Sequence, residues 1–253
     1  MSESSSPDLT DTQVHVWRAS LSVSDGVVHS LRSLLSEDEL HRASRFSFQE
    51  LRRHFIVRRG QLRTVLALYL QENPRNLRFD YGPQDKPRLV GKRAWEDLGF
   101  NASHSHGMAL LAVAVRRELG IDLEKIRDDM DHTEIASRYF TPAEAAAIAA
   151  APPEVRSLLF FDYWTCKEAW VKARGGGLSV PLSRFEIRLV SDDTHAEVVG
   201  VDPRDSETKG FVHRLRVAPG FAAALAVTQP DATISLRDWT PRTVGLEGPL
   251  KPP

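Results

Sequence analysis

The 253-residue chain is 42% hydrophobic, enough to fill the core of one large domain or two small ones. Its 33 basic and 34 acidic residues give a formal net charge of -1, which argues against a nucleic-acid binder or a protein of anionic membrane surfaces. The single cysteine, Cys166, excludes an internal disulfide framework and a multi-cysteine zinc site. This cysteine usage fits a reducing compartment, so we expect a cytoplasmic protein.

The two ends of the chain show no periodic pattern. The first residues lack a basic segment followed by an apolar one, and no uncharged run approaches the ~20 residues that span a bilayer. We therefore expect neither secretion nor membrane insertion. Residues 1–12 and the Pro- and Gly-containing residues 230–253 are expected to be loose tails.

Between these ends, the same order of elements occurs twice. Capping-box spacing begins a helix at Ser36 to Glu39 and again at Thr141 to Glu144. Each box is followed by a long helical pattern, over residues 50–71 and 155–174, and then by an extended segment, LRFDY or FEIRLV. Short strand patterns open the two series, VHVWRA and IDLEKI, and small apolar runs close them, GMALLAVAV and GFAAALAVT.

This repetition predicts an α+β fold of two similar halves related by a pseudo-twofold axis. The expected halves are residues 13–118 and 119–229, each a small sheet packed with a long helix. We expect the active site in the cleft between them, where ligands commonly bind. The alternative is one domain whose internal similarity is coincidental.

Two acidic residues share one face of the IDLEKI strand. Asp122 and Glu124 alternate with the apolar residues Ile121 and Leu123, so a strand places both carboxylates side by side. Neighbouring like charges repel each other, and a bound metal cation would make such a pair favourable. The alternative is a solvated strand face with two ordinary acids.

The helix FFDYWTCKEAWVKA carries further charges. Thr165, Glu168 and Lys172 fall on one face, and Lys167 is placed to reach the same cleft from its edge. The helix is too apolar for a solvated surface element, so this charged pair indicates a wet cleft or a ligand. The alternative is a surface Glu-Lys pair. The following GGG is interpreted as a helix stop.

Two segments upstream offer groups that bind anions. Lys86 precedes Pro87, which favours an extended backbone at the lysine, although an ordinary turn lysine is the alternative. In NASHSH, the short donors around Ser103 and His104 precede a buried strand, a suitable place for anion contacts. His104 and His106 without a third soft ligand do not favour zinc.

The segments GIDLEKI and YWTCKEAWVKARGGGL together resemble the paired signature of the phosphopantetheinyl transferase superfamily, Sfp type, with DKPRL and FNASHSH upstream. The resemblance covers roughly residues 37–190. It implies transfer of the phosphopantetheine arm of coenzyme A to a serine of an acyl, peptidyl or aryl carrier protein, in the presence of Mg²⁺. It also implies a monomer, because both halves occur in one chain.

The resemblance further implies a role for each matching residue. The implied magnesium ligands are Asp122, Glu124 and Glu168, with Glu168 also the catalytic base. Catalytic Lys172 is expected to contact the coenzyme A phosphates, with support from Lys167. The remaining coenzyme A contacts are Lys86, Ser103 and His104 near the nucleotide phosphates, and Arg42 near the 3′-phosphate, where arginine replaces the commoner lysine.

Two other functions use the same residues. A magnesium-dependent phosphoesterase would employ the same carboxylates with water as nucleophile, but the near-neutral composition lacks the basic stripe of a nuclease. A non-catalytic coenzyme A or carrier-protein binding module is the other alternative. The presence of all three acids argues against it.

Overall fold

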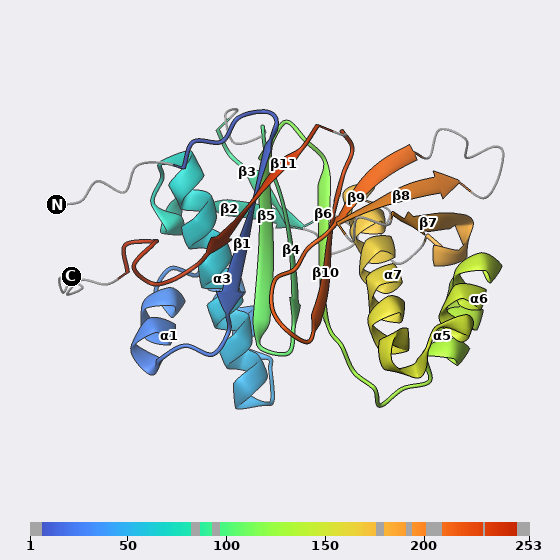
Figure 1. Cartoon of the computed structure of the whole chain (residues 1–253). Helices are drawn as coiled ribbons and strands as arrows, with labels where there is room; N and C mark the ends of the chain where they lie inside the picture. The colour runs from blue at the N-terminus through green and yellow to red at the C-terminus, as the bar shows by residue number, and fades with distance from the viewer. Residues whose placement is uncertain are drawn as a thin grey trace.

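The computed structural model describes residues 7–81, 87–92, 97–175, 180–190, 194–200, 209–229 and 231–246. Over these residues the chain has a mixed α+β fold, with a four-stranded sheet, a five-stranded sheet and a two-stranded hairpin. Figure 1 shows the two larger sheets in the middle of the molecule, with the long helices α3 (Gln49–Leu70) and α7 (Pro153–Ala173) on opposite sides.

The four-stranded sheet has the order β11-β1-β5-β4, in which β11 runs parallel to β1 and the other neighbours are antiparallel. Its strands are β1 (Gln13–Ser20), β4 (Leu98–Ser105), β5 (Met108–Val115) and β11 (Thr233–Asp238). The elements near α3 are α1 (Asp25–Arg32), α2 (Glu37–Ser44), η1 (Pro74–Asn76) and the hairpin of β2 (Arg78–Tyr81) and β3 (Pro87–Val90).

The five-stranded sheet is antiparallel throughout, in the order β6-β10-β9-β8-β7. Its strands are β6 (Leu119–Lys125), β7 (Phe185–Leu189), β8 (His195–Gly200), β9 (Lys209–Arg214) and β10 (Phe221–Val227). With it lie α5 (His132–Tyr139), α6 (Pro142–Ala150), α7 and η3 (Leu182–Arg184). No helix in the described part of the chain has the length and apolar character needed to cross a bilayer.

Strand alternation explains how these layers stack. On β1, Trp17 and Ala19 pack toward α3, whereas Val14 and Val16 pack with residues of the second sheet. On β6, Ile121 and Leu123 belong to this inter-sheet core, and the opposite face of the five-stranded sheet packs against α7. The layers therefore follow the order α3, four-stranded sheet, five-stranded sheet, α7.

The sequence patterns that predicted helices and strands are confirmed. Capping boxes are present at both expected positions, before α2 and before α6. The long patterns form α3 and α7, and the strand patterns form β1, β2, β5, β6, β7 and β10. Gly175, just beyond α7, has φ +64°, the left-handed conformation with which glycine ends a helix.

The expectation of a loose C-terminal tail is wrong for its described part. Residues Thr233–Asp238 form β11, which pairs with β1 over six residues. Next along the chain, Trp239 is buried and donates a hydrogen bond from Nε1 to Thr64 Oγ1 of α3 at 3.1 Å. The first tail is also partly tied down, since Asp11 pairs with Arg116 and Leu9 packs on the core beside α3. Pairing and burial, rather than local composition, order these segments.

Candidate functional site

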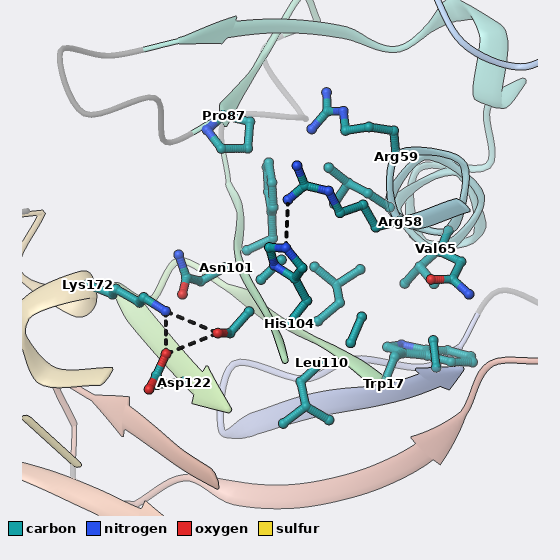
Figure 2. A pocket seen from close by; sticks show the side chains of 18 of the residues that line it. Trp17, Arg58, Arg59, Val65, Pro87, Asn101, His104, Leu110, Asp122 and Lys172 are labelled. Atoms are coloured by element: carbon teal, nitrogen blue, oxygen red, sulfur yellow. Dashed lines mark hydrogen bonds and ion pairs between the residues drawn. The ribbon is translucent and has the colours of Figure 1, made fainter. Parts of the chain in front are cut away.

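A cavity of about 790 Å³ lies between the elements of the two larger sheets. Its walls come from α2, α3 and the β4–β5 strands on one side and from β6 and α7 on the other. Figure 2 shows Arg58 and His104 on the α3 side and Asp122 and Lys172 on the opposite side. Seven of the expected site residues line it: Arg42, Ser103, His104, Asp122, Glu124, Glu168 and Lys172.

Strand β4 divides its side chains between the two walls. Asn101, Ser103 and Ser105 point toward β6: Asn101 Oδ1 accepts from the Ile121 amide at 2.8 Å, and Ser105 Oγ accepts from the Lys125 amide at 3.1 Å. His104 lies on the other face of β4, toward α3 (Figure 2). The NASHSH segment therefore joins the two sheets with one set of side chains and offers His104 to the cavity with the other.

The approach of β6 to α7 brings Asp122 and Lys172 together. A Cβ atom at Gly120 would lie 2.1 Å from Ala169 O and 2.3 Å from Ala173 N of α7, so only glycine permits this packing. Lys172 Nζ donates to Asp122 Oδ1 at 2.6 Å and to Ser103 Oγ at 3.2 Å. Ser103 in turn donates to the same carboxylate oxygen at 3.0 Å.

The three acids expected from the sequence all face this cavity. Burial and the nearby charge of Asp122 raise the pKa of Glu124 and also the pKa of Glu168 above their usual range. Ser105 donates to Glu124 at 3.0 Å and opposes part of this effect. The Oδ2 atom of Asp122 is buried and has no hydrogen-bond partner among the described residues. Mutual repulsion and an unsatisfied oxygen both favour a cation here.

These carboxylates do not converge in the arrangement described. Among the described residues, no three side chains of the His, Cys, Asp or Glu type lie close enough together to hold a metal ion as they stand. Asp122 Oδ1 is instead neutralised by Lys172. The Lys172–Asp122 ion pair forms one electrostatic cluster with Glu124 and Glu168, because the charge of Asp122 raises the pKa of both glutamates.

The expectation for Lys167 is corrected by the packing of α7. Lys167 is fully buried, pairs with Glu144 at 2.9 Å, and donates to Leu182 O and Phe185 O at 2.8 and 2.6 Å. Its side chain thus fastens α7 to α6 and to the start of β7, and does not reach the cavity. Lys86 lies outside the described residues.

Sequence reasoning gave no role to two arginines of α3 that line the cavity, Arg58 and Arg59. Arg59 is held by Glu39, with its Nε 2.8 Å from the carboxylate, and donates to Tyr81 Oη at 2.7 Å. Arg58 Nη1 lies 3.4 Å from His104 Nε2. The sequence feature that could have indicated their role is the adjacent arginine pair in the middle of a largely buried helical segment, because a buried charge requires a partner or a ligand.

Comparisons with known proteins show which family the chain is similar to. Residues 118–226 match the model of the 4′-phosphopantetheinyl transferase superfamily. The chain is 43% identical over 185 residues to the 4′-phosphopantetheinyl transferase HetI of Nostoc sp., covering 72% of this chain and 78% of HetI. It is 28% identical over 199 residues to the 4′-phosphopantetheinyl transferase Sfp of Bacillus subtilis, covering 79% and 84% of the two chains.

A crystal structure of Thermotoga maritima holo-[acyl-carrier-protein] synthase aligns with 44% of this chain and 62% of that chain, with a TM-score of 0.34 and 22% identity. This alignment is too partial to bear on the fold. The extent of the match to HetI places the chain in the 4′-phosphopantetheinyl transferase superfamily. Its activity is that of a 4′-phosphopantetheinyl transferase.

Proposed function

We propose that the chain transfers the 4′-phosphopantetheine arm of coenzyme A to a serine hydroxyl of an acyl, peptidyl or aryl carrier protein and releases adenosine 3′,5′-bisphosphate. The observation that carries this proposal is the Lys172–Asp122–Ser103 cluster beside Glu124 and Glu168, in a cavity whose opposite wall is basic. A basic wall suits the charged phosphates of the donor, and the acidic cluster suits the reacting centre.

Three acids in this cluster fit a magnesium ion by their chemistry. Mg²⁺ prefers oxygen ligands and is commonly held by carboxylates together with substrate phosphates. Asp122, Glu124 and Glu168 would hold it, since Asp122 Oδ2 has no hydrogen-bond partner in the described part of the chain and the two glutamates have raised pKa values. When bound, the ion would neutralise charge on the phosphates and on these carboxylates.

Glu168 is proposed as the base for the carrier serine. Its raised pKa makes it a better proton acceptor near neutral pH than an ordinary carboxylate. As the serine oxygen forms a bond to the phosphorus next to pantetheine, Glu168 takes the hydroxyl proton. The bond from that phosphorus to the bridging oxygen breaks, and adenosine 3′,5′-bisphosphate leaves with the electron pair.

The remaining cavity residues bind and orient the donor. Lys172 is placed to contact the phosphates and to stabilise the charge that develops on them, because its ammonium group already faces the carboxylate cluster. Ser103 and His104 offer further contacts from β4, and Arg42 contributes charge from α2. Lys86 keeps its expected role as a phosphate contact.

The organisation of the chain supports a single-chain active site. We infer that residues 13–118 and 119–229 are pseudo-twofold related halves, because each contains one long helix packed on one sheet and the order of elements repeats. The first half is completed by β11. Since one chain supplies both walls of the cavity, we propose a monomer. We also propose a cytoplasmic location, where coenzyme A and carrier proteins occur.

One experiment tests the proposed reaction against its alternatives. The protein is incubated with Mg²⁺, coenzyme A and a purified carrier protein, and the carrier is weighed by mass spectrometry. A gain of one phosphopantetheine on the carrier serine supports transfer, and a carrier with serine replaced by alanine is the control. Phosphopantetheine released without any carrier would instead indicate a phosphoesterase. Coenzyme A binding without either product would indicate a binding module.

A further inference from the structure

Arg58 is a cation in the cavity that has no acidic partner in the described part of the chain. Its guanidinium points from α3 toward His104 (Figure 2), with Nη1 3.4 Å from Nε2 of that histidine and with the Phe55 ring centroid 5.1 Å from Cζ. Among the described residues, no carboxylate lies within ion-pair distance of Arg58. Its neighbours on the same helix differ, because Arg59 and Arg63 both pair with Glu39.

The surroundings of Arg58 are positive. Burial, with help from Arg59 and Arg42, lowers the pKa of Arg58 to about 10, so the side chain is still charged at neutral pH. A partly buried charge that faces other cations and lacks a counter-ion is unfavourable. An anion bound in the cavity would remove this penalty.

His104 cannot supply a counter-charge and is itself kept neutral. Burial first, then Arg58 and His54 of α3 and Lys172 of α7, lowers the pKa of His104 to about 4. Arg58 and His104 thus form a donor-rich pair on the α3 wall, across the cavity from Lys172 and Asp122 (Figure 2).

We propose that Arg58, which lines the same cavity wall as Arg42, binds the 3′-phosphate of coenzyme A and distinguishes coenzyme A from dephospho-coenzyme A. This inference rests on the proposed function. The phosphate monoester carries up to two negative charges, and an arginine fork binds such a group through two parallel hydrogen bonds. The pyrophosphate of coenzyme A must lie at the reacting centre, beside Lys172 and Glu168. The 3′-phosphate monoester is therefore expected to bind at the basic α3 wall.

The geometry assigns different phosphates to different cations. Lys172 is engaged with Asp122 and Ser103 at the carboxylate cluster, where phosphorus is attacked. Arg58 lies beside His104 on the α3 side of the cavity, whereas Lys172 and Asp122 lie on the opposite side (Figure 2). Loss of Arg58 should consequently weaken recognition of the monoester alone, without altering how the pyrophosphate is held.

The test combines two ligands with three proteins. Dissociation constants for coenzyme A and dephospho-coenzyme A are measured by calorimetry on the wild-type chain, on Arg58→Gln, and on Arg52→Gln. Arg52 is an exposed arginine of the same helix that contacts only Phe46 O among the hydrogen bonds of the described residues, so it matches the charge change. The dissociation constants of adenosine 3′,5′-bisphosphate and adenosine 5′-monophosphate are measured in the same way, because these two ligands differ in the 3′-phosphate and lack the pantetheine arm.

Arg58→Gln should weaken coenzyme A binding by roughly 10- to 100-fold, as expected for a hydrogen bond to a charged group, and leave dephospho-coenzyme A within about threefold. Arg52→Gln should change neither constant. Arg58→Lys keeps the charge and loses the fork, so its loss should be intermediate. Equal losses for both ligands, or no loss, would overturn the assignment of Arg58. Failure of the wild-type chain to bind either ligand would overturn the proposed function as well.

Discussion

Lys172 on α7 and Asp122 on β6 form an ion pair of 2.6 Å across the junction where these two elements pack most closely. The same Asp122 carboxylate leaves its second oxygen buried and unpaired among the described residues. This side chain is therefore bound on one oxygen and available on the other, so its removal should affect both the lysine and a metal ligand set.

Asp122→Ala should abolish most turnover, mainly by weakening Mg²⁺ binding. Asp122 is the acid that is hydrogen-bonded to both Lys172 and Ser103, so its loss disturbs the whole cluster as well as the metal ligand set. Raising the Mg²⁺ concentration should recover part of the activity, which a Mg²⁺ titration of initial rates would show. Asp129→Ala, at an exposed position beyond β6, is the matched control. Unchanged activity at low Mg²⁺ would remove Asp122 from the metal site.

Glu168→Gln separates catalysis from donor binding. The glutamine keeps the size and one oxygen but loses the basic site, whose loss typically lowers the rate roughly 10²–10⁴-fold. Weaker metal binding should add to that loss. Coenzyme A should still bind within several-fold, because the phosphate contacts come from other residues. Rapid-quench rates and calorimetry measure the two effects. A near-normal maximal rate with weaker carrier binding would make Glu168 a docking residue.

Coenzyme A should protect the chain against thermal unfolding. A ligand held by residues of both walls, Arg58 and His104 on one and Lys172 on the other, stabilises only the folded form. At a hundred times the dissociation constant, the stabilisation is ~2.7 kcal/mol. For a chain of this size that corresponds to a rise in Tm of roughly 5–11 °C. Calorimetric scans with Mg²⁺ and coenzyme A measure it, and an unchanged Tm would contradict the two-walled site.

Lys167→Met should damage stability rather than coenzyme A binding. Removing one member of a buried ion pair leaves the other charge uncompensated, at a cost of roughly 3–5 kcal/mol, and Lys167 pairs with Glu144 inside the core. The double variant Lys167→Met/Glu144→Gln should be less destabilised than the single one. Urea unfolding and the KM for coenzyme A, taken where the variant is folded, give the two readouts. A variant with unchanged stability and a raised KM for coenzyme A would show instead that Lys167 contributes to coenzyme A binding.

Local patterns predicted most of the fold because they act over short distances. Glu144 completes a capping box three residues from Thr141, and Ile121 and Leu123 alternate with Asp122 and Glu124 on one strand. These relationships are set by neighbours in the sequence. They placed the three acids and Lys172 on elements that meet at the cavity.

The failures concern contacts between distant segments. Lys167 and Lys172 lie on the same helix, and periodicity alone does not say which of its faces meets the cavity and which meets α6. The pairing of β11 with β1 joins residues more than two hundred positions apart. The local pattern of residues 230–253, which contain Pro and Gly, does not predict this pairing. The position of Arg58 in the cavity, with no carboxylate partner among the residues described, depends on tertiary packing and could not be predicted from the helical pattern.

The β1–β11 junction contains a buried histidine, His15, that should make stability depend on pH. Arg237 Nη2 of β11 lies 3.2 Å from His15 Nε2 and donates a hydrogen bond to it. The neutral histidine therefore carries its proton on Nδ1, which lies 2.8 Å from Tyr69 Oη of α3. Burial first, and then Arg237, lowers the pKa of His15 to about 4, although Asp8 acts in the opposite direction.

A histidine whose pKa is lower in the folded state binds its proton in the unfolded chain first. Between pH 6.5 and about 4 the unfolded state therefore holds more protons, and stability is lost as the pH falls through this window. Above pH 6.5 this contribution is constant. The full loss is on the order of 3 kcal/mol. Urea unfolding at steps from pH 7.5 to 4.5 measures the slope, and comparison with a His15 variant separates this histidine from the other groups that titrate there, His104 and the carboxyls of Glu124 and Glu168 with their raised pKa values.

His15→Gln should be less stable than the wild type at pH 7.5, because its contacts to Arg237 and Tyr69 are disturbed, but its stability should depend less on pH between 6.5 and 4.5. His29→Gln, at an exposed position of α1, is the matched control and should keep the wild-type slope. The two variants differ in burial and not in the residue type removed. An unaltered slope in His15→Gln would show that another group is responsible for the acid sensitivity and that the β1–β11 junction does not sense pH through this histidine.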